Sequence, residues 1–228
     1  MASHLTPWID PPAELTLTRG DVHLWRFRLD LPVAELDDLR GVLRPDELAR
    51  ADRLRDPVNA ARFVAARGRL RQTLARYLGC LSEEVSFVYG EQGKPRLVGP
   101  AGNKLRFNLS HAGLWGVTAV VERFEVGVDL EKVDAQLDYV KVAASYFSAE
   151  EAAALEQYQV ERRRRGFYRL WTCKEARLKG SGFGFHCSSV SDNSGKTWQT
   201  RLFVVDRGYL GAFAVAGEVL SVCKWQSF

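Results

Sequence analysis

Two carboxylates in an apolar run are separated by a single residue. Residues 126–131 read Val-Gly-Val-Asp-Leu-Glu. Because side chains alternate across a strand, Asp129 and Glu131 must share one face while the apolar residues take the other. Adjacent carboxylates repel unless a cation lies between them, and Mg²⁺ commonly binds one or two carboxylates together with substrate phosphates. An ordinary strand with one solvated face has the same pattern, so this motif alone leaves both interpretations open.

A second group of charged residues follows a tryptophan about forty residues later. Residues 171–179 read Trp-Thr-Cys-Lys-Glu-Ala-Arg-Leu-Lys, and a glycine-rich stretch occupies 180–184. On a helix, Trp171, Glu175 and Lys179 share a face, with Lys174 just beside it. A Glu–Lys pair at this spacing is often only a surface helix stabiliser. The tryptophan on the same face and the glycines beyond it favour a face that is not fully solvated.

A serine and a histidine end the predicted strand of residues 105–109. Ser110 and His111 raise the question of a hydrolase nucleophile and its base. Neighbours in sequence rarely face each other, and no Gly-x-Ser-x-Gly turn surrounds this serine, so we reject that interpretation. Both side chains can instead donate hydrogen bonds to a phosphate, although a structural role for the histidine explains the pattern as well.

Arginines dominate the segment from Arg50 to Arg76, which holds eight of them and only two acidic residues. This excess predicts a local positive field that attracts an anionic partner. Arg67 falls inside the apolar stripe of the predicted helix. A buried guanidinium needs an anion, so Arg67 should meet either a protein carboxylate or a ligand. Arg62 and Arg69 flank that stripe, where solvated positions would explain them equally well.

Apolar periodicity predicts alternating strands and helices along the chain. An amphipathic helix is expected over 59–78, ending at Gly79, and Ser148 with Glu151 has the spacing of a capping box for a later helix. Both halves run from a strand through helices to a hairpin, with a boundary expected near 123–125. The expected strands are 22–29, 85–89, 105–109, 115–121, 125–130, 198–205 and 209–216, and the expected helices 59–78, 138–147, 149–159 and 162–179.

Composition narrows the class of protein. The chain has 228 residues, 46% of them hydrophobic, and a net charge of +4. Such a chain can bury a sizeable core in one large or two small domains, and its charge is modest for a nucleic-acid binder. No run approaches the ~20 apolar residues of a membrane span, and the first residues lack the pattern of a signal peptide. Cytoplasmic location follows as the expectation, and the scattered cysteines should be reduced thiols.

Four motifs in this order resemble the 4′-phosphopantetheinyl transferases, in particular the large monomeric, surfactin-synthetase-activating type. The motifs are Gly93-Lys-Pro95, Phe107-Asn-Leu-Ser-His111, Gly127-Val-Asp-Leu-Glu131 and Trp171-Thr-Cys-Lys-Glu-Ala-Arg-Leu-Lys179. The resemblance implies an α/β (α+β) fold of two similar, pseudo-symmetric halves, 1–124 and 125–228, each with a small antiparallel sheet packed on helices. Coenzyme A would bind in the cleft between them.

The resemblance also implies an activity, a metal and partners. The phosphopantetheine arm of coenzyme A would pass to a serine of an apo acyl or peptidyl carrier protein of fatty-acid, polyketide or nonribosomal-peptide synthesis. Adenosine 3′,5′-bisphosphate would be released. Mg²⁺, or Mn²⁺ in its place, would be the cofactor. A monomer is expected, with no nucleic-acid or membrane partner.

Site residues carry over from the matched motifs. Asp129, Glu131 and Glu175 would hold the metal, and Lys174 and Lys179 would contact the diphosphate. Lys94, Ser110 and His111 would hold the nucleotide end, with Arg62, and Arg50 or Arg67, at the 3′-phosphate. Glu175 is our candidate base for the attacking serine, while Asp129 and Lys179 complete the catalytic set. Two rivals remain: a nucleotide- or RNA-binding protein that uses the arginines, and a catalytically silent coenzyme A binder.

Overall fold

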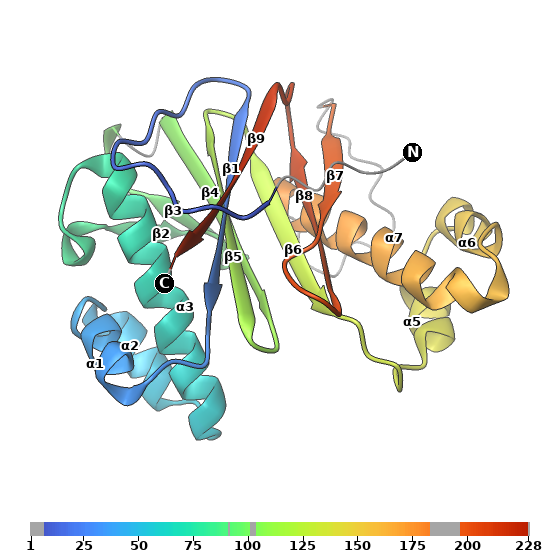
Figure 1. Ribbon diagram of the computed structural model, residues 1–228, viewed down its shortest axis with the longest axis horizontal. Coiled ribbons are helices and arrows are strands. Elements are labelled where there is room, and N and C mark those ends of the chain that lie inside the picture. The colour runs from blue at the N-terminus through green and yellow to red at the C-terminus, as the bar shows by residue number, and fades with distance from the viewer. Residues whose placement is uncertain (1–6, 91, 101–103, 183–196, 228) are drawn as a thin grey trace.

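The computed structural model describes residues 7–90, 92–100, 104–182 and 197–227. Figure 1 shows two small sheets in the middle of the molecule, with a long helix on the outer side of each. The layers therefore run helix, sheet, sheet, helix. This mixed α/β arrangement agrees with the fold class expected from the sequence.

The first sheet is built mostly from the N-terminal half. Its strand order is β4-β5-β1-β9, where β1 is Asp21–Arg28, β4 Leu105–Ala112, β5 Trp115–Glu122 and β9 Ser221–Ser227. The long helix α3 (Pro57–Leu78) covers its outer face. Shorter elements of this half are α1 (Val33–Gly41), α2 (Pro45–Asp52), a 3-10 turn at Ser82–Glu84, and the two-stranded pair β2 (Phe87–Tyr89) and β3 (Pro95–Leu97).

The second sheet has the order β6-β8-β7 and lies in the C-terminal half. Its strands are β6 (Val126–Lys132), β7 (Gln199–Phe203) and β8 (Tyr209–Val215). Helix α7 (Val160–Ser181) packs on its outer face, and α5 (Tyr139–Tyr146) with α6 (Ala149–Glu156) forms a separate lobe. β6 is an edge strand of this sheet, and β4 of the first sheet lies beside it.

Alternation within the strands builds the layers. Val22 and Leu24 of β1 face β6, whose apolar side chains Val126, Val128 and Leu130 complete the core between the sheets. Trp25, the next residue of β1, points the other way and packs against α3. The predicted division of residues 126–131 into one apolar and one acidic face is therefore confirmed.

Most predicted elements are present with small shifts at their ends. Helix α3 begins after Asp56, whose side chain accepts a hydrogen bond from Val58 N at 3.1 Å, and it ends at Gly79 with φ 63°. Ser148 and Glu151 form the expected capping box of α6. Strand β4 continues to Ala112, so Ser110 and His111 lie inside it rather than beyond it.

Five of the described elements lack a counterpart in the predictions: α1, α2, the 3-10 turn at Ser82–Glu84, β3 and β9. β9 pairs with β1 in parallel, with Val22 opposite Val222. The first sheet is therefore mixed, whereas an antiparallel sheet was expected. It also carries residues 221–227 of the predicted C-terminal half into the N-terminal sheet. The division into 1–124 and 125–228 therefore separates β5 from β6 but does not follow the sheets. Residues 183, 184 and Cys187 lie outside the described part of the chain.

Candidate active site

A buried carboxylate from β6 meets a lysine from α7 and a serine from β4. Lys179 Nζ lies 2.6 Å from Asp129 Oδ1 and 3.0 Å from Ser110 Oγ. Ser110 Oγ is itself 3.3 Å from Asp129 Oδ1. Asp129 is 3% exposed and Ser110 is 5% exposed. Three elements far apart in sequence thus converge on one small, charged volume.

Glu175 and Glu131 belong to the same cluster. Burial, reinforced by the negative charge of Asp129, raises the pKa of Glu175 to about 7, although Lys179 opposes the shift. Burial and then Asp129 also raise the pKa of Glu131. Trp171 Nε1 donates to Glu131 Oε1 at 3.1 Å, which fixes that carboxylate. The predicted shared face of Trp171, Glu175 and Lys179 therefore points at the two acids of β6.

The cluster has more negative charge than its own cation balances. Asp129 Oδ2 and Glu175 Oε1 are buried and have no hydrogen-bond partner among the described residues. Buried carboxylate oxygens normally have a partner, so two without one in the same cluster suit a cation. In the described part of the chain, however, no three His, Cys, Asp or Glu side chains are arranged to hold a metal ion as they stand. The donor set fits Mg²⁺ chemically.

Glycines allow α7 to approach β6 closely enough to form this cluster. Gly127 shares the face of Asp129 and Glu131, and a Cβ on it would overlap the Ala176 carbonyl oxygen and the main chain at Gly180. Only a residue without a side chain permits this contact. The glycine that precedes Asp129 by two residues therefore brings the helix that carries Glu175 onto the strand that carries Asp129.

Lys94 is anchored to the main chain of both β6 and α7. Its Nζ donates to Gly180 O at 2.8 Å and Val126 O at 3.1 Å, and it lies 3.4 Å from Glu125 Oε2. Burial lowers the pKa of this ammonium group, against the opposing effect of Glu125. Lys94 thus caps the last turn of α7 and fastens the beginning of β6.

Two other predicted phosphate ligands have carboxylate partners. Lys174 Nζ is 2.6 Å from Glu151 Oε2, and Arg62 Nε is 3.1 Å from Asp30 Oδ1. The pKa of His111 is lowered by desolvation and then by the positive charges of Lys179 and Arg62. Arg62 and Lys179 therefore lie near enough to His111 to act on it electrostatically.

Four of the eight arginines of residues 50–76 pair with protein carboxylates, so the predicted positive field is partly neutralised. Arg67 and Arg71 both bind the carboxylate of Glu47, at 3.1 and 2.7 Å, and all three side chains are buried. Arg69 pairs with Glu35. Of the two anions proposed for Arg67, the structure supplies the protein carboxylate. Glu47 comes from α2, which periodicity missed, so the pairing had no signal in the sequence.

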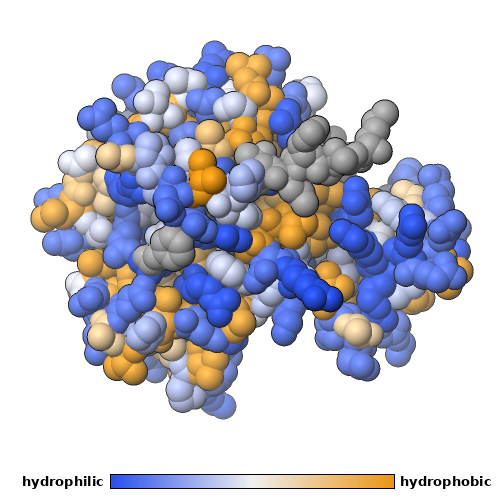
Figure 2. Space-filling model, in the orientation of Figure 1, coloured by the Kyte–Doolittle hydropathy of each residue, from blue (hydrophilic) through white to orange (hydrophobic). Residues whose placement is uncertain are grey.

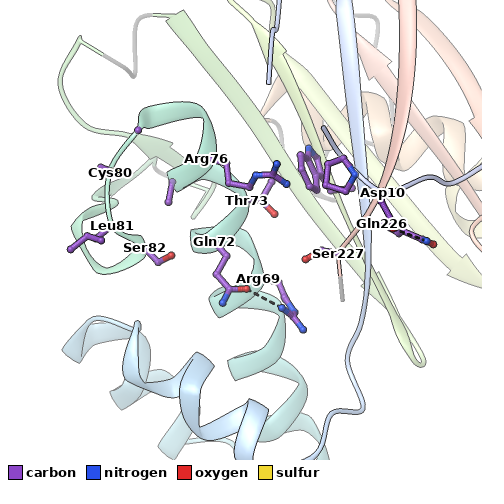
Figure 3. Close-up of a pocket in the computed structure, with 14 residues that line it drawn as sticks. Asp10, Arg69, Gln72, Thr73, Arg76, Cys80, Leu81, Ser82, Gln226 and Ser227 are labelled. Carbon is purple, nitrogen blue, oxygen red and sulfur yellow. Dashed lines mark hydrogen bonds between the residues drawn. The ribbon is translucent and has the colours of Figure 1, made fainter. Parts of the chain in front are cut away.

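The surface between the halves is mixed in character. Figure 2 shows an indentation between the α1–α3 region and the α5–α6 lobe, with hydrophilic side chains along it and a hydrophobic patch nearer the middle of the molecule. A pocket of about 840 Å³ lies elsewhere, where α3 meets the end of β9 (Figure 3). Arg69, Gln72 and Arg76 line it, and it contains no residue of the acidic cluster. This pocket and the chemistry of the cluster are therefore separate.

One contributor to the site was not predicted from the sequence. Asn108 lies two residues before Ser110 on β4, and its Oδ1 accepts a hydrogen bond from Val128 N at 2.8 Å. The signal that could have found it is the alternation of 107–110, which places Asn108 and Ser110 on one face. Both side chains contact β6 on either side of Asp129.

Comparison with known proteins defines the class. Residues 125–213 match the family model described as the 4′-phosphopantetheinyl transferase superfamily, a range that includes all three acids of the cluster. The 4′-phosphopantetheinyl transferase HetI of Nostoc sp. is 37% identical over 222 residues, which are 92% of this chain and 94% of the relative. The chain therefore belongs to the 4′-phosphopantetheinyl transferase superfamily and is a transferase.

Two further relatives bear the same functional name. The putative 4′-phosphopantetheinyl transferase slr0495 of Synechocystis sp. is 37% identical over 161 residues, covering 71% of this chain and 65% of the relative. The 4′-phosphopantetheinyl transferase psf-1 of Bacillus pumilus is 29% identical over 174 residues, covering 75% and 72%. The superfamily predicted from the motifs is confirmed.

Within the described residues, no helix combines the length and the apolar character needed to cross a bilayer.

Proposed function

We propose that this protein transfers the 4′-phosphopantetheine arm of coenzyme A to a serine of an apo acyl or peptidyl carrier protein, in a Mg²⁺-dependent reaction. The observation that carries the proposal is the convergence of Asp129, Glu175 and Lys179 around buried carboxylate oxygens without partners among the described residues. Such a cluster suits a substrate whose reacting part is a diphosphate. Membership of the superfamily supports the same reaction.

Each residue of the cluster has a proposed role. Asp129, Glu131 and Glu175 would hold the divalent cation, whose bound charge neutralises the diphosphate. Lys179, already at the centre of the cluster, would donate to a diphosphate oxygen. The carrier serine oxygen forms a bond to the phosphorus of the phosphopantetheine arm, and the bond from that phosphorus to the bridging oxygen breaks. The bridging oxygen leaves with adenosine 3′,5′-bisphosphate.

Glu175 is the proposed acceptor of the serine proton, directly or through a water. A general base works best with a pKa near the working pH, and burial brings the pKa of Glu175 to about 7 in the absence of a cation. A cation held by the same carboxylate would lower this pKa. Glu175 Oε1, which has no partner among the described residues, is an acceptor available to such a proton. Lys179 counteracts the rise in the pKa of Glu175 and so helps keep the carboxylate ionised.

The remaining predicted ligands belong to the nucleotide end, apart from Lys174 at the diphosphate. His111 and Ser110 are proposed to hold the nucleotide, with Arg62, and Arg50 in addition, at the 3′-phosphate. Arg62 and Lys174 would exchange their present carboxylate partners for phosphate oxygens. Arg67 is left out of the proposed set, because Glu47 already neutralises it in the interior. Lys94 is proposed to support the site through its contacts to β6 and α7.

Intact-mass measurement tests the reaction. Incubation with coenzyme A, Mg²⁺ and an apo carrier protein should add the mass of one phosphopantetheine arm to the carrier. Addition of EDTA should stop the reaction, and a carrier with alanine at the modified serine should gain no mass. A carrier that stays unmodified while calorimetry detects coenzyme A binding would favour the silent-binder alternative instead.

The large monomeric, surfactin-synthetase-activating type remains the finer proposal. Its support is the pair of helix-covered sheets within one chain. Sedimentation velocity should give a single species with the mass of one chain. A trimer would favour the smaller holo-acyl-carrier-protein synthase type.

A further inference from the structure

The outer edge of β6 is held by side chains rather than by another strand. β6 is the last strand of its sheet, and β4 of the other sheet lies beside it. Val128 N donates to Asn108 Oδ1 at 2.8 Å, and Leu130 N donates to Ser110 Oγ at 3.2 Å. Lys94 binds the carbonyl of Val126 on the same edge. Side chains at alternate positions thus replace a main-chain ladder between the sheets.

Asn108 holds the residue directly before Asp129. It is 8% exposed, and its neighbours Phe107 and Leu109 face the α3 side of the sheet, so its own side chain points toward β6. Ser110 holds the residue directly after Asp129. The main chain on both sides of the carboxylate is therefore fixed by β4. Ser110 also contacts Asp129 and Lys179, whereas within the described residues Asn108 makes no hydrogen bond to a proposed ligand side chain.

We propose that Asn108 is a positioning residue that sets the place of the Asp129 carboxylate against Lys179. The inference rests on the proposed function, because it assigns Asn108 a role in that reaction through Asp129. Without Oδ1, the buried Val128 N–H has no acceptor, and this edge of β6 must move to find one. A shift of about 1 Å at a reacting group costs on the order of 10²-fold. Loss of a residue that orients a metal ligand typically costs roughly 10–100-fold.

The matched control is Gln199 of β7. Its Oε1 accepts a hydrogen bond from the main-chain Val219 N at 3.2 Å, the same kind of contact on a strand that bears no site residue. Asn108→Ala and Gln199→Ala each remove one side-chain acceptor from a partly or fully buried main-chain N–H. A purely structural role for Asn108 predicts the same kinetic behaviour in both variants.

Kinetics form the first arm of the test, at a temperature where circular dichroism shows both variants folded. We expect Asn108→Ala to lower kcat by about 10–100-fold with little change in the KM for coenzyme A. Gln199→Ala should keep the kcat of the unaltered protein. Unchanged kcat in folded Asn108→Ala, or an equal loss in both variants, would overturn the assignment.

Crystallography forms the second arm and needs no activity. In Asn108→Ala the contact between Lys179 Nζ and Asp129 Oδ1, 2.6 Å in the unaltered protein, should lengthen or break. Its persistence together with an unmoved β6 would contradict the proposal even if the carrier reaction were never observed. If the unaltered protein fails to modify a carrier, that result contradicts the proposed function. The crystal structure of Asn108→Ala would still show whether Asn108 positions Asp129.

Discussion

Helices α3 and α7 both carry charged side chains into the interior, but these charges differ in how they are paired. On α3, buried Arg67 and Arg71 share the carboxylate of Glu47. On α7, Glu175 faces the acids of β6, where Lys179 pairs with Asp129, and two carboxylate oxygens have no partner among the described residues. Each buried arginine of α3 has a carboxylate partner, with Arg69 Nε alone left without an acceptor in the described part of that helix, whereas the cluster at α7 has more acids than cations and is incomplete.

The pairing of buried charges locates the functional site better than the density of charged residues does. The arginine-rich segment is the more conspicuous feature of the sequence, yet each of its buried arginines is paired with a protein carboxylate. Breaking such a pair costs stability, whereas incomplete pairing raises the free energy of the folded state and is tolerated where a ligand completes it. Pairing, rather than composition, therefore distinguishes structural charges from reactive ones.

The largest effect expected is the loss of transfer activity when an acid of the incomplete cluster is replaced. Asp129→Ala and Glu175→Ala should each abolish transfer, a loss of at least about 10²–10³-fold, because each removes charge that holds the cation or the proton. Far-ultraviolet circular dichroism should show the fold unchanged. Asp52→Ala, at the exposed last residue of α2, is the control and should keep the turnover of the unaltered protein. Normal turnover by either site variant would contradict the metal assignment.

The complementary change breaks the buried cluster of Glu47 with Arg67 and Arg71. Glu47→Gln should destabilise the fold by about 3–5 kcal/mol, because it leaves the buried Arg67 and Arg71 without their shared counter-charge. Urea unfolding measures the loss. The folded fraction should turn over at the usual rate. A stable variant with impaired turnover would mean that this cluster belongs to the site after all.

Removing one carboxylate from the incomplete cluster should instead stabilise the protein. The folded pKa of Glu175 is raised to about 7, above its ordinary 4.5, so its charged form opposes folding once the pH exceeds 4.5, and fully above 7. Glu175→Gln in EDTA should therefore gain on the order of 2–3 kcal/mol at pH 8 and little at pH 5. Urea unfolding at the two pH values checks this. Equal gains at both would exclude the carboxyl as the cause.

The smallest effect concerns steering by the arginines. Because four of the eight arginines of residues 50–76 already pair with protein carboxylates, the rate of carrier modification should fall only a few-fold from about 0.05 M to about 0.5 M salt, not by the roughly 10–10³ of strongly steered encounters. The encounter rate at limiting carrier concentration is the measurement. A steep decline would show that exposed arginines such as Arg53 and Arg55 still guide an acidic partner.

The periodicity of the sequence predicted the strand and the helix that carry the site residues, but not the contact between them. Alternation placed Asp129 and Glu131 on one face, and helical period placed Glu175 and Lys179 on another, and both are confirmed. Nothing in either period says that the two faces touch. That contact depends on Gly127, whose role appears only when the helix lies against it. The motif resemblance supplied the link that periodicity lacked.

The features that could not be predicted depend on contacts between residues far apart in the sequence. Lys94, Lys174 and Arg62 were predicted from the motifs and residue types, but the carboxylates that bind them lie far away in the sequence or on elements without a clear pattern. Strand β9 was missed because its pairing with β1 joins residues 200 positions apart, and its partly buried side chains show no regular alternation. Such contacts are fixed by topology.

The return of β9 to β1 closes the molecule on itself. The chain passes once from the first sheet to the second after β5 and comes back with its last strand, so each sheet depends on the other half of the sequence. Cutting the chain at the 124–125 boundary would leave β1 with an open edge and β9 without a partner. Separate expression of the two pieces should therefore yield aggregation-prone fragments, and the intact enzyme should melt in one cooperative transition.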